Sequence, residues 1–344
     1  MELTMKHASR GFVRFRRPVT VAASACLGGK LEKEGPYGRC LDLCLDADDL
    51  HTDSFEKAEA EMARRTVAIL LAKARLADTD VDLLVGGDLM NQCTATAYGL
   101  ASFDIPYMGL YGACSTFALG LLTAASLIDA GDVRRAVVCA SSHFCTAERQ
   151  FRFPPAYGSV PTPTSQTTVT GVGAVLLTAD DGGGESRVTL TDGLFGRVSD
   201  SGVNDGANMG AAMATAASDS IARYLAASGE DLRDFDAFAT GDLGSEGQAI
   251  LAELLEKRGL TADGVLCDCG EMIYDRARQS VGCGGSGCGC SAVMTAGYFA
   301  AALREGTFRR AALGGTGALM SPQSLKQGLS IPAVCHVVAF KREE

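Results

Sequence analysis

The chain alternates between two hydrophobic patterns. In some stretches apolar residues recur every three or four positions, which predicts amphipathic helices, and in others they form short runs, which are typical of buried strands. The clearest helix is predicted to begin at Asp53, because Glu56 follows at the spacing of a capping box, and to end before Asp78. Its predicted apolar face consists of Phe55, Ala58, Met62, Ile69 and Leu76. Since helix and strand alternate along the chain, we expect an α/β fold with a mostly parallel sheet.

A long uncharged stretch runs from Ile105 to Ile128. Its length suggests a membrane span, but Pro106, Gly109 and Gly112 interrupt it and leave a helix of only about 15 residues. We therefore interpret this stretch as a short strand, a turn and a buried core helix. Further helices are predicted over 218–227 and 248–257, and a closing strand over 331–340.

Two landmarks of the first half of the chain recur in the second half. Residues 79–89 align with residues 233–243, including two aspartates and a final Gly-Asp-Leu. Cys114-Ser115, with a helix and then a strand that begins at two arginines, corresponds to Cys290-Ser291 with the same elements after it. The repeat predicts two pseudo-symmetric α/β halves, residues 1–183 and 184–344, which meet near a glycine-rich turn.

Composition narrows the possible partners. The 344 residues are 47% hydrophobic and 21% charged, enough for a large core, and the net charge of -10 argues against nucleic acid as a partner.

Basic residues cluster at the N-terminus, but no apolar segment follows them, so a signal peptide is not expected. Thirteen cysteines, an odd number, predict a reducing, cytoplasmic compartment. Since no transmembrane segment is expected, any attachment to a membrane should be peripheral or through partners.

The most distinctive chemistry lies at Cys114, on a sharp turn between the apolar strand and the core helix. Unpaired amides and the dipole at the start of a helix favour a thiolate, so Cys114 has the position of a nucleophile. Acyl transfer at such a thiol normally needs imidazole bases, and the chain has four histidines: His7, His51, His143 and His336. His143 follows a predicted strand, where α/β proteins place ligand contacts, and His336 is interpreted as a core residue. Cys114 thus belongs either to a working enzyme or to an enzyme-shaped pocket that binds a ligand.

Five cysteines of the second half lie in and before a glycine-rich loop. They are Cys267, Cys269, Cys283, Cys288 and Cys290. Zinc sites favour Cys-x2-Cys knuckles, whereas these spacings are Cys-x-Cys and Cys-x4-Cys-x-Cys, so no metal is expected. The glycines are instead interpreted as allowing this backbone to approach the Cys114 turn closely.

These landmarks resemble the thiolase and β-ketoacyl synthase superfamily and, within it, the stage V sporulation protein AD family. The resemblance spans nearly the whole chain and rests on segments within 87–92, 112–116, 141–152, 168–171, 196–198, 268–274 and 284–293. It implies a thiolase-like fold, two halves packed as α-β-α-β-α layers, with the superfamily's nucleophile at Cys114. Working condensing enzymes bring a histidine, and a second histidine or an asparagine, to this thiol from the second half. The corresponding stretch here, residues 240–246, contains neither.

The resemblance also implies a role in sporulation. It predicts a non-catalytic protein that binds dipicolinic acid (pyridine-2,6-dicarboxylate), alone or with Ca²⁺, for uptake into the developing spore, without a further cofactor. The expected partners are other stage V sporulation membrane proteins and a second copy of the chain, in a homodimer. The expected location is the cytoplasmic side, peripherally associated with the spore inner membrane. Two alternatives stay open: a Cys114-dependent acyltransferase or ketoacyl synthase-like condensing enzyme, and a purely structural subunit.

In the resemblance-based site, Cys114 forms the base of the pocket, with Ser115 and Thr116 on the same turn. Ser142 and His143 are predicted to offer hydrogen bonds to the carboxylates of the ligand, because a neutral imidazole can donate one.

Arg149 and Arg152 complete the predicted ligand contacts. A planar guanidinium suits a dicarboxylate, since two parallel N–H donors match each carboxylate. The alternative for these arginines is an ion pair with Glu148 or a contact between subunits.

Overall fold

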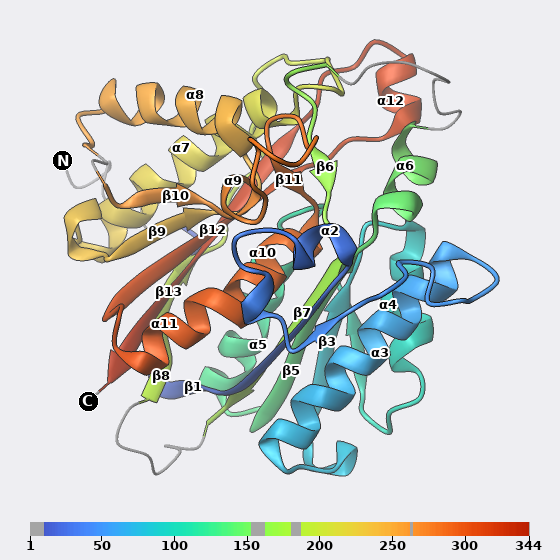
Figure 1. The fold of residues 1–344 in the computed structure, drawn as a ribbon. Coiled ribbons are helices and arrows are strands. Elements are labelled where there is room, and N and C mark those ends of the chain that lie inside the picture. Colours follow the sequence, from blue (N-terminus) through green and yellow to red (C-terminus); the bar gives the residue numbers. More distant parts are fainter. Residues whose placement is uncertain (1–9, 153–161, 180–186, 262–263, 344) are drawn as a thin grey trace.

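In the computed structural model, residues 10–152, 162–179, 187–261 and 264–343 are described. Ten of their strands lie in one large sheet in the order β10-β9-β12-β13-β8-β1-β7-β5-β3-β4, and a short strand, β2 (Leu43–Cys44), pairs with β1 beside it (Figure 1). Strands β6 (Thr167–Thr168) and β11 (Gly285–Ser286) form a separate two-stranded sheet. The strands that the first half contributes to this order are β1 (Phe12–Gly28), β3 (Leu83–Gly87), β4 (Tyr107–Gly109), β5 (Arg135–Ser142) and β7 (Gly171–Thr178). Those of the second half are β8 (Arg187–Leu194), β9 (Ala237–Thr240), β10 (Leu266–Asp268), β12 (Arg310–Ala318) and β13 (Ala333–Glu343). Two equivalent sets of five strands therefore meet where β1 pairs with β8.

The sheet is mixed, so the expectation of a mostly parallel sheet is wrong. Strands β4, β3 and β5 are parallel, as are β10, β9 and β12. Strands β7 and β13 are antiparallel to both of their neighbours, and β1 is antiparallel to β8. The helix-strand alternation of the sequence predicts the parallel strands but does not reveal the direction in which β7 and β13 return.

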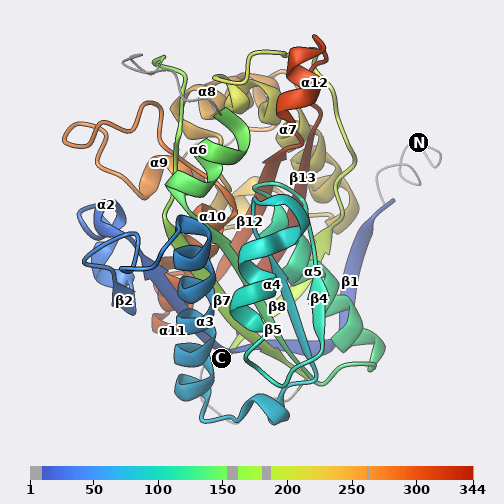
Figure 2. The same ribbon diagram turned by 90° about the vertical axis from the view of Figure 1, so that its right-hand side faces the viewer.

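The helices pack against the sheet in layers. Helices α3 (Phe55–Ala74) and α4 (Thr94–Leu100) cover the outer face of the first half, and in Figure 2 they lie in front of its strands. Helices α7 (Met209–Ser228) and α8 (Gly244–Glu256) form the opposite outer layer. Helix α5 (Thr116–Ala130) contacts β1, β3 and β5 of one half and β12 and β13 of the other. The layers follow the α-β-α-β-α order expected of a thiolase-like fold.

The rest of the middle layer comes from the second half. Helix α10 (Cys288–Met294) continues through a π-helical turn (Thr295–Phe299) into α11 (Ala300–Glu305). Helix α10 packs on β5 and β7, whereas α11 packs on β8 and β13. This arrangement is the counterpart of α5, although Cys290 and Ser291 lie inside α10, whereas Cys114 and Ser115 precede α5.

Helix α5 has the predicted length of 15 residues. Residues Ala113–Ala130 are, within the described ranges, the one helical stretch long and apolar enough to cross a membrane, but 67% of them are buried inside the protein. Large side chains such as Phe117 and Leu121 are fully enclosed there. The stretch is therefore the core helix that its interruptions by proline and glycine predict.

Other predicted boundaries differ in detail. Helix α3 is capped by Ser54, whose Oγ accepts a hydrogen bond from the amide of Lys57, whereas Asp53 pairs with the Lys57 side chain. Leu76 lies beyond the helix, because Arg75 adopts a left-handed conformation that ends it. Helix α7 begins earlier than predicted, at Met209, over a run of small residues whose periodicity is too weak to reveal a face.

The internal repeat is visible as equivalent contacts in the two halves. The carboxylate of Asp82 accepts hydrogen bonds of 2.8 and 2.9 Å from two successive amides where β5 begins. That of Asp236 accepts bonds of 2.7 and 2.9 Å from the two amides where β12 begins. The predicted junction of the halves, near 183, lies outside the described residues.

Candidate functional site

Cys114 lies on a tight turn directly before α5, with Ala113 in a left-handed conformation at φ +51°. The Ser115 hydroxyl donates to the carbonyl of Gly112 at 2.6 Å. The Thr116 hydroxyl donates to the carbonyl of Ala113 at 2.7 Å and accepts from the amide of Gly112 at 3.0 Å. Both predicted ligand contacts, Ser115 and Thr116, are thus buried and engaged in holding the turn.

The neighbours of the thiol come from the second half of the chain. The Sγ atom of Cys114 lies 3.8 Å from the Oγ atom of Ser286, in strand β11 (Gly285–Ser286). Ser286 donates in turn to the carboxylate of Asp242 at 3.1 Å, and the amide of Gly287 donates to the same oxygen at 3.0 Å. The hydroxyl of Thr316 donates to the other oxygen at 2.8 Å. The cysteine therefore faces a fully buried carboxylate held by three donors.

These surroundings oppose ionisation of the thiol. Burial raises the pKa of Cys114 well above the ordinary value for cysteine, and the negative charge of Asp242 raises it further. Burial also raises the pKa of Asp242, to about 7. The expectation that the helix start favours a thiolate is therefore wrong, because desolvation and a neighbouring carboxylate outweigh the helix dipole.

A small cavity opens above the thiol. It has a volume of about 40 Å³ and is lined by residues of both halves. Its lining is mainly apolar: Leu89, Ala113, Cys114, Ala147, Glu148, Phe151, Thr168, Met209, Ser286, Ala318 and Met320. Three of these, Ala147, Glu148 and Phe151, belong to helix α6 (Phe144–Arg152), which forms one wall.

Imidazole groups do not line this cavity in the described part of the chain. His51 is exposed, and His7 lies outside the described residues. His336 is buried in β13, where its Nδ1 accepts from the amide of Gly196 at 3.1 Å and burial lowers its pKa to about 4. Its interpretation as a core residue is consistent with these contacts.

His143 lines a second and larger cavity beneath α6, of about 500 Å³. Its Nε2 lies 3.0 Å from the carbonyl oxygen of Asp48, and its Nδ1 accepts from the amide of Cys145 at 3.1 Å. The second bond requires an unprotonated Nδ1, so in the neutral imidazole Nε2 carries the proton. Burial lowers the pKa of His143 from its ordinary value, which favours this neutral form.

Hydroxyl and carboxyl groups gather in the lining of the second cavity. Hydroxyl groups of six residues line it: Thr162, Ser165, Thr167, Thr168, Thr170 and Ser280. Its carboxyl groups are those of Glu32, Asp48 and Glu148. Thr168 and Glu148 line the Cys114 cavity as well, so the two cavities adjoin there. None of the lysines and arginines whose side chains are described lines either cavity.

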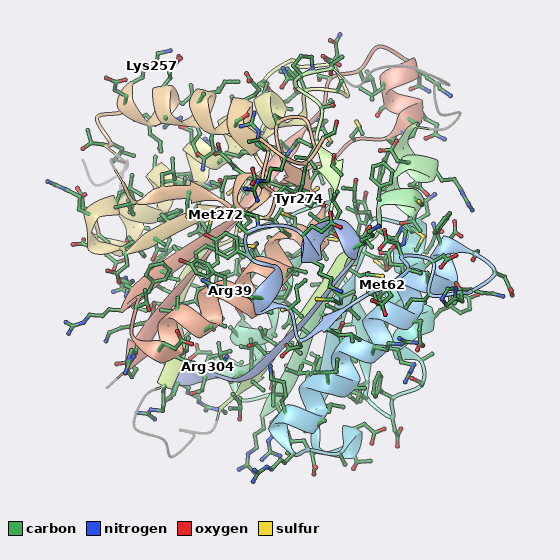
Figure 3. The ribbon with its side chains drawn as sticks, viewed as in Figure 1. Arg39, Met62, Lys257, Met272, Tyr274 and Arg304 are labelled. Carbon is green, nitrogen blue, oxygen red and sulfur yellow. The ribbon has the colours of Figure 1, made fainter. Side chains whose placement is uncertain are left out.

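The carboxyl group of Glu32 has an oxygen without a hydrogen-bond partner. Its Oε1 accepts from the amide of Thr170 at 3.0 Å and from the hydroxyl of Tyr274, whereas its buried Oε2 has no hydrogen-bond partner. Burial raises the pKa of Glu32 to about 7. Figure 3 shows Tyr274 close to the segment that carries α2 (Lys30–Lys33), so this contact joins the two halves.

Arg149 and Ser142, two further predicted contacts, line neither cavity. Arg149 is half-exposed and forms an ion pair of 2.7 Å with Glu56, a different partner from the Glu148 considered above. The Ser142 hydroxyl is buried, donates to the carbonyl of Val169 at 2.7 Å and accepts from the amide of Gly289 at 3.2 Å. Arg152 ends α6, and its side chain lies outside the described part of the structure. The structure therefore brings Cys114 and His143 to adjoining cavities but does not group them with Arg149 or Ser142.

The cysteines of the glycine-rich loop make separate contacts. Cys288 Sγ donates to the carbonyl of Ser141 at 2.9 Å, and Cys290 Sγ lies 3.6 Å from the carbonyl of Gly241. Within the described ranges, no three His, Cys, Asp or Glu side chains come together as metal ligands. The glycines let the loop pack closely on the end of β5, because a β-carbon on Gly287 would lie 2.7 Å from the Ser142 hydroxyl. The predicted approach to the Cys114 turn is made through Ser286, at 3.8 Å from Sγ.

Comparison with known proteins places this site in a family. Residues 9–341 match the family model of stage V sporulation protein AD. Stage V sporulation protein AD of Bacillus subtilis (strain 168) is 38% identical over 328 residues, which cover 95% of this chain and 96% of the Bacillus protein. The chain belongs to the stage V sporulation protein AD family. Membership of this family confirms the resemblance recognised in the sequence.

Solved structures of other proteins show the same fold as this member of the stage V sporulation protein AD family. Cerulenin-bound OleA of Xanthomonas campestris is similar with a TM-score of 0.60 at 14% identity, covering 96% of this chain and 98% of that chain. 3-Oxoacyl-[acyl-carrier-protein] synthase III of Aquifex aeolicus is similar with a TM-score of 0.57 at 13% identity, covering 94% and 99%. The thiolase-like fold is confirmed, and the neighbours in fold are enzymes, whereas the family is named for sporulation.

Proposed function

We propose that this protein binds dipicolinate without catalysing a reaction on it, and delivers it for uptake into the developing spore together with stage V sporulation membrane proteins. The ligand would lie in the two adjoining cavities beneath α6, with Cys114 at the base. The observation that carries this proposal is the pairing of the Cys114 thiol with Asp242 and Ser286. A condensing enzyme of this fold has imidazole or amide groups beside its cysteine instead.

The state of the thiol supports binding over catalysis. A nucleophilic cysteine needs a base that removes its proton and surroundings that stabilise the thiolate. Burial and the Asp242 charge both raise the pKa of Cys114, so the thiol stays protonated at neutral pH. A protonated thiol is a small, weakly polar group that packs against a ligand.

The size and charge of the cavities support a calcium chelate as the bound form. A cavity of about 500 Å³ has room for a planar ligand of about a dozen non-hydrogen atoms. The lining carries Glu32, Asp48 and Glu148 without a described basic side chain, so a bare dianion would be repelled. A chelate of dipicolinate with Ca²⁺ has no net charge, and Ca²⁺ accepts additional carboxylate oxygens.

We also place the protein peripherally at the spore inner membrane, on the cytoplasmic side, as a homodimer. Support for the homodimer comes from β4, an edge strand with its outer backbone groups open to pairing. Tyr98, Tyr107 and Tyr111, near this edge, are 78%, 41% and 47% exposed. Exposed aromatic side chains beside an open strand are typical of surfaces that bind another protein.

Isothermal titration calorimetry tests the ligand. Dipicolinate should bind, more tightly with CaCl₂ present, and benzene-1,3-dicarboxylate should bind more weakly because it lacks the ring nitrogen that chelates calcium. Absence of binding by the folded protein under every condition would refute the proposal. The acyltransferase alternative predicts instead a covalent acyl group on Cys114 and turnover after incubation with acyl-CoA, both visible by mass spectrometry.

A further inference from the structure

A basic surface lies where β1, β8 and β13 come together, at lower left in Figure 1. Two neighbouring hollows share Arg310, Lys341 and Glu343 in this region and have volumes of about 490 and 730 Å³. Among their described lining residues, basic side chains outnumber acidic ones by eight to four. This local excess stands out because the whole chain has a net charge of -10. We call this region the β1 basic surface.

A bulge in β1 exposes two of the arginines of this surface. The pairing of β1 with β8 shifts register between Arg14 and Val19, so the intervening residues bulge from the ladder. The amides of Arg16 and Arg17 are held by the Asp129 carboxylate at 2.6 and 2.8 Å. The side chains of these two arginines are left exposed, and no ion pair to a described carboxylate is present at either of them. The bulge therefore holds two cationic groups toward solvent on a fixed backbone.

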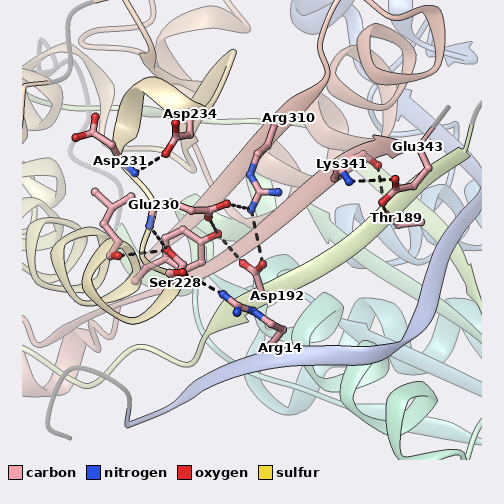
Figure 4. Close-up of polar contacts among 12 residues, drawn as sticks. Arg14, Thr189, Asp192, Ser228, Glu230, Asp231, Asp234, Arg310, Lys341 and Glu343 are labelled. Atoms are coloured by element: carbon pink, nitrogen blue, oxygen red, sulfur yellow. Dashed lines mark hydrogen bonds and ion pairs between the residues drawn. The ribbon is translucent and has the colours of Figure 1, made fainter. Parts of the chain in front are cut away.

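Figure 4 shows the inner part of the same surface. Arg310 lies 2.5 Å from Glu230 and 3.7 Å from Asp192 through one terminal nitrogen, while its Nε is buried without a hydrogen-bond partner. The buried Oγ1 of Thr191 also lacks a partner. Lys341 reaches Glu343 at 3.1 Å but stays exposed. The surface thus combines exposed cations with unused hydrogen-bond capacity at its floor.

We propose that the β1 basic surface docks on anionic phospholipid headgroups. This inference depends on the peripheral membrane attachment in the proposed function and identifies the face that makes it. The cations spread over two open hollows instead of converging on one point, which suits an extended charged surface more than a single small anion. The exposed large apolar side chains all lie elsewhere among the described residues, and a protein interface would need such anchors at its centre.

The position of this surface leaves the ligand site accessible. In Figure 1, helix α6 and strand β6 (Thr167–Thr168), which border the two cavities, lie at the top, away from the lower-left β1 basic surface. Docking through this surface would place the cavities away from the lipid and toward partners or solution.

Vesicle sedimentation tests the inference. The full chain should bind vesicles of phosphatidylcholine with 30% phosphatidylglycerol, should not bind phosphatidylcholine alone, and should be released by 0.5 M NaCl, because salt screens charges at such a surface. The double variant Arg16→Glu with Lys341→Glu should lower the bound fraction at least about tenfold, since each basic group near an anionic membrane contributes about one kcal/mol.

A matched control is Lys257→Glu with Arg278→Glu, which changes the charge equally at side chains 71% and 86% exposed. Figure 3 places Lys257 at the top of the molecule. The control should bind vesicles nearly as the wild type does. Equal binding of vesicles by the two double variants would overturn the inference. It would also be overturned if the folded wild-type protein did not bind anionic vesicles, and an acidic protein would then be the partner that fits this surface. Dipicolinate binding by the Arg16 and Lys341 variant should be unchanged, so failure here is distinguishable from failure of the proposed function.

Discussion

The Sγ atom of Cys114 lies 3.8 Å from the Oγ atom of Ser286, although 172 positions separate the two residues in the chain. This contact joins the helix start of one half to the glycine-rich loop of the other. Ser286 also donates to Asp242, so the thiol belongs to a buried polar cluster to which no described imidazole contributes. The chemistry of Cys114 is therefore set by the second half of the chain.

Replacing Asp242 with asparagine should make Cys114 more reactive. Removal of a buried negative charge lowers the pKa of the thiol, so more thiolate forms at a given pH. We expect alkylation of Cys114 by iodoacetamide at pH 9 to accelerate about tenfold, as a decrease of one pKa unit implies. Peptide-resolved mass spectrometry measures this rate, and the partly exposed Cys145 in the same chain serves as the reference. An unchanged rate at Cys114 would show that burial alone controls the thiol.

Glu32 should make the stability of the protein depend on pH. Its folded-state pKa of about 7 lies above the ordinary carboxyl value, so its stabilising contribution is complete at low pH and is lost as the pH rises toward 7. Between pH 5 and pH 8 we expect the wild type to lose about 2–3 kcal/mol of unfolding free energy from this group.

The variant Glu32→Gln isolates that contribution. A glutamine keeps the Oε1 acceptor for Thr170 and Tyr274 and places a neutral amide where Oε2 has no partner. Urea unfolding at pH 5 and pH 8 should show a smaller loss for Glu32→Gln than for the wild type. Identical pH profiles would mean that Glu32 does not ionise in the folded protein within this range.

His143→Ala should weaken the binding of calcium dipicolinate by about tenfold or more, because it removes part of the wall of the larger cavity and leaves the Asp48 carbonyl and the Cys145 amide without their partner. Arg149→Ala should have little effect, since Arg149 pairs with Glu56 and lines neither cavity. Titration calorimetry of both variants makes the comparison. A greater loss for Arg149→Ala than for His143→Ala would place the ligand outside these cavities.

Gly173→Ala should destabilise the packing of β7 against α10. A β-carbon at Gly173 would lie 2.1 Å from the carbonyl oxygen of Ala292, a backbone atom that cannot move without displacing the helix. We expect a cost of about 3 kcal/mol or more in chemical unfolding. Gly202→Ala is the control: its φ of +79° strains an alanine, but nothing lies within 4 Å, so the cost should be about 1–2 kcal/mol. Equal losses for the two variants would refute the close approach.

The features predicted correctly from the sequence are local. The length of α5 follows from Pro106, Gly109 and Gly112, which interrupt an uncharged stretch. The repeated aspartates of 79–89 and 233–243 predict equivalent positions, and Asp82 and Asp236 make equivalent bonds. Such features depend on neighbours along the chain, so a single sequence reveals them.

The features missed depend on contacts between distant segments. Asp242 is the central residue of one copy of the repeated Gly-Asp-Leu motif, which marks it as a candidate, but its effect on Cys114 requires the two halves to be packed together. The carboxyl group of Glu32 lines a cavity with residues more than a hundred positions away, such as Thr170. The ion pair of Arg149 with Glu56 is hidden in the sequence for the same reason, because Glu56 lies on a separate helix.

The most direct test of the central claim compares two substitutions at Cys114 by titration with calcium dipicolinate. If the cysteine only forms the base of a ligand cavity, Cys114→Ser should bind within about threefold of the wild type, whereas Cys114→Phe, which fills a space of about 40 Å³, should bind at least about tenfold more weakly. Loss of function in Cys114→Ser together with acyl transfer by the wild type would contradict the account and identify Cys114 as a nucleophile.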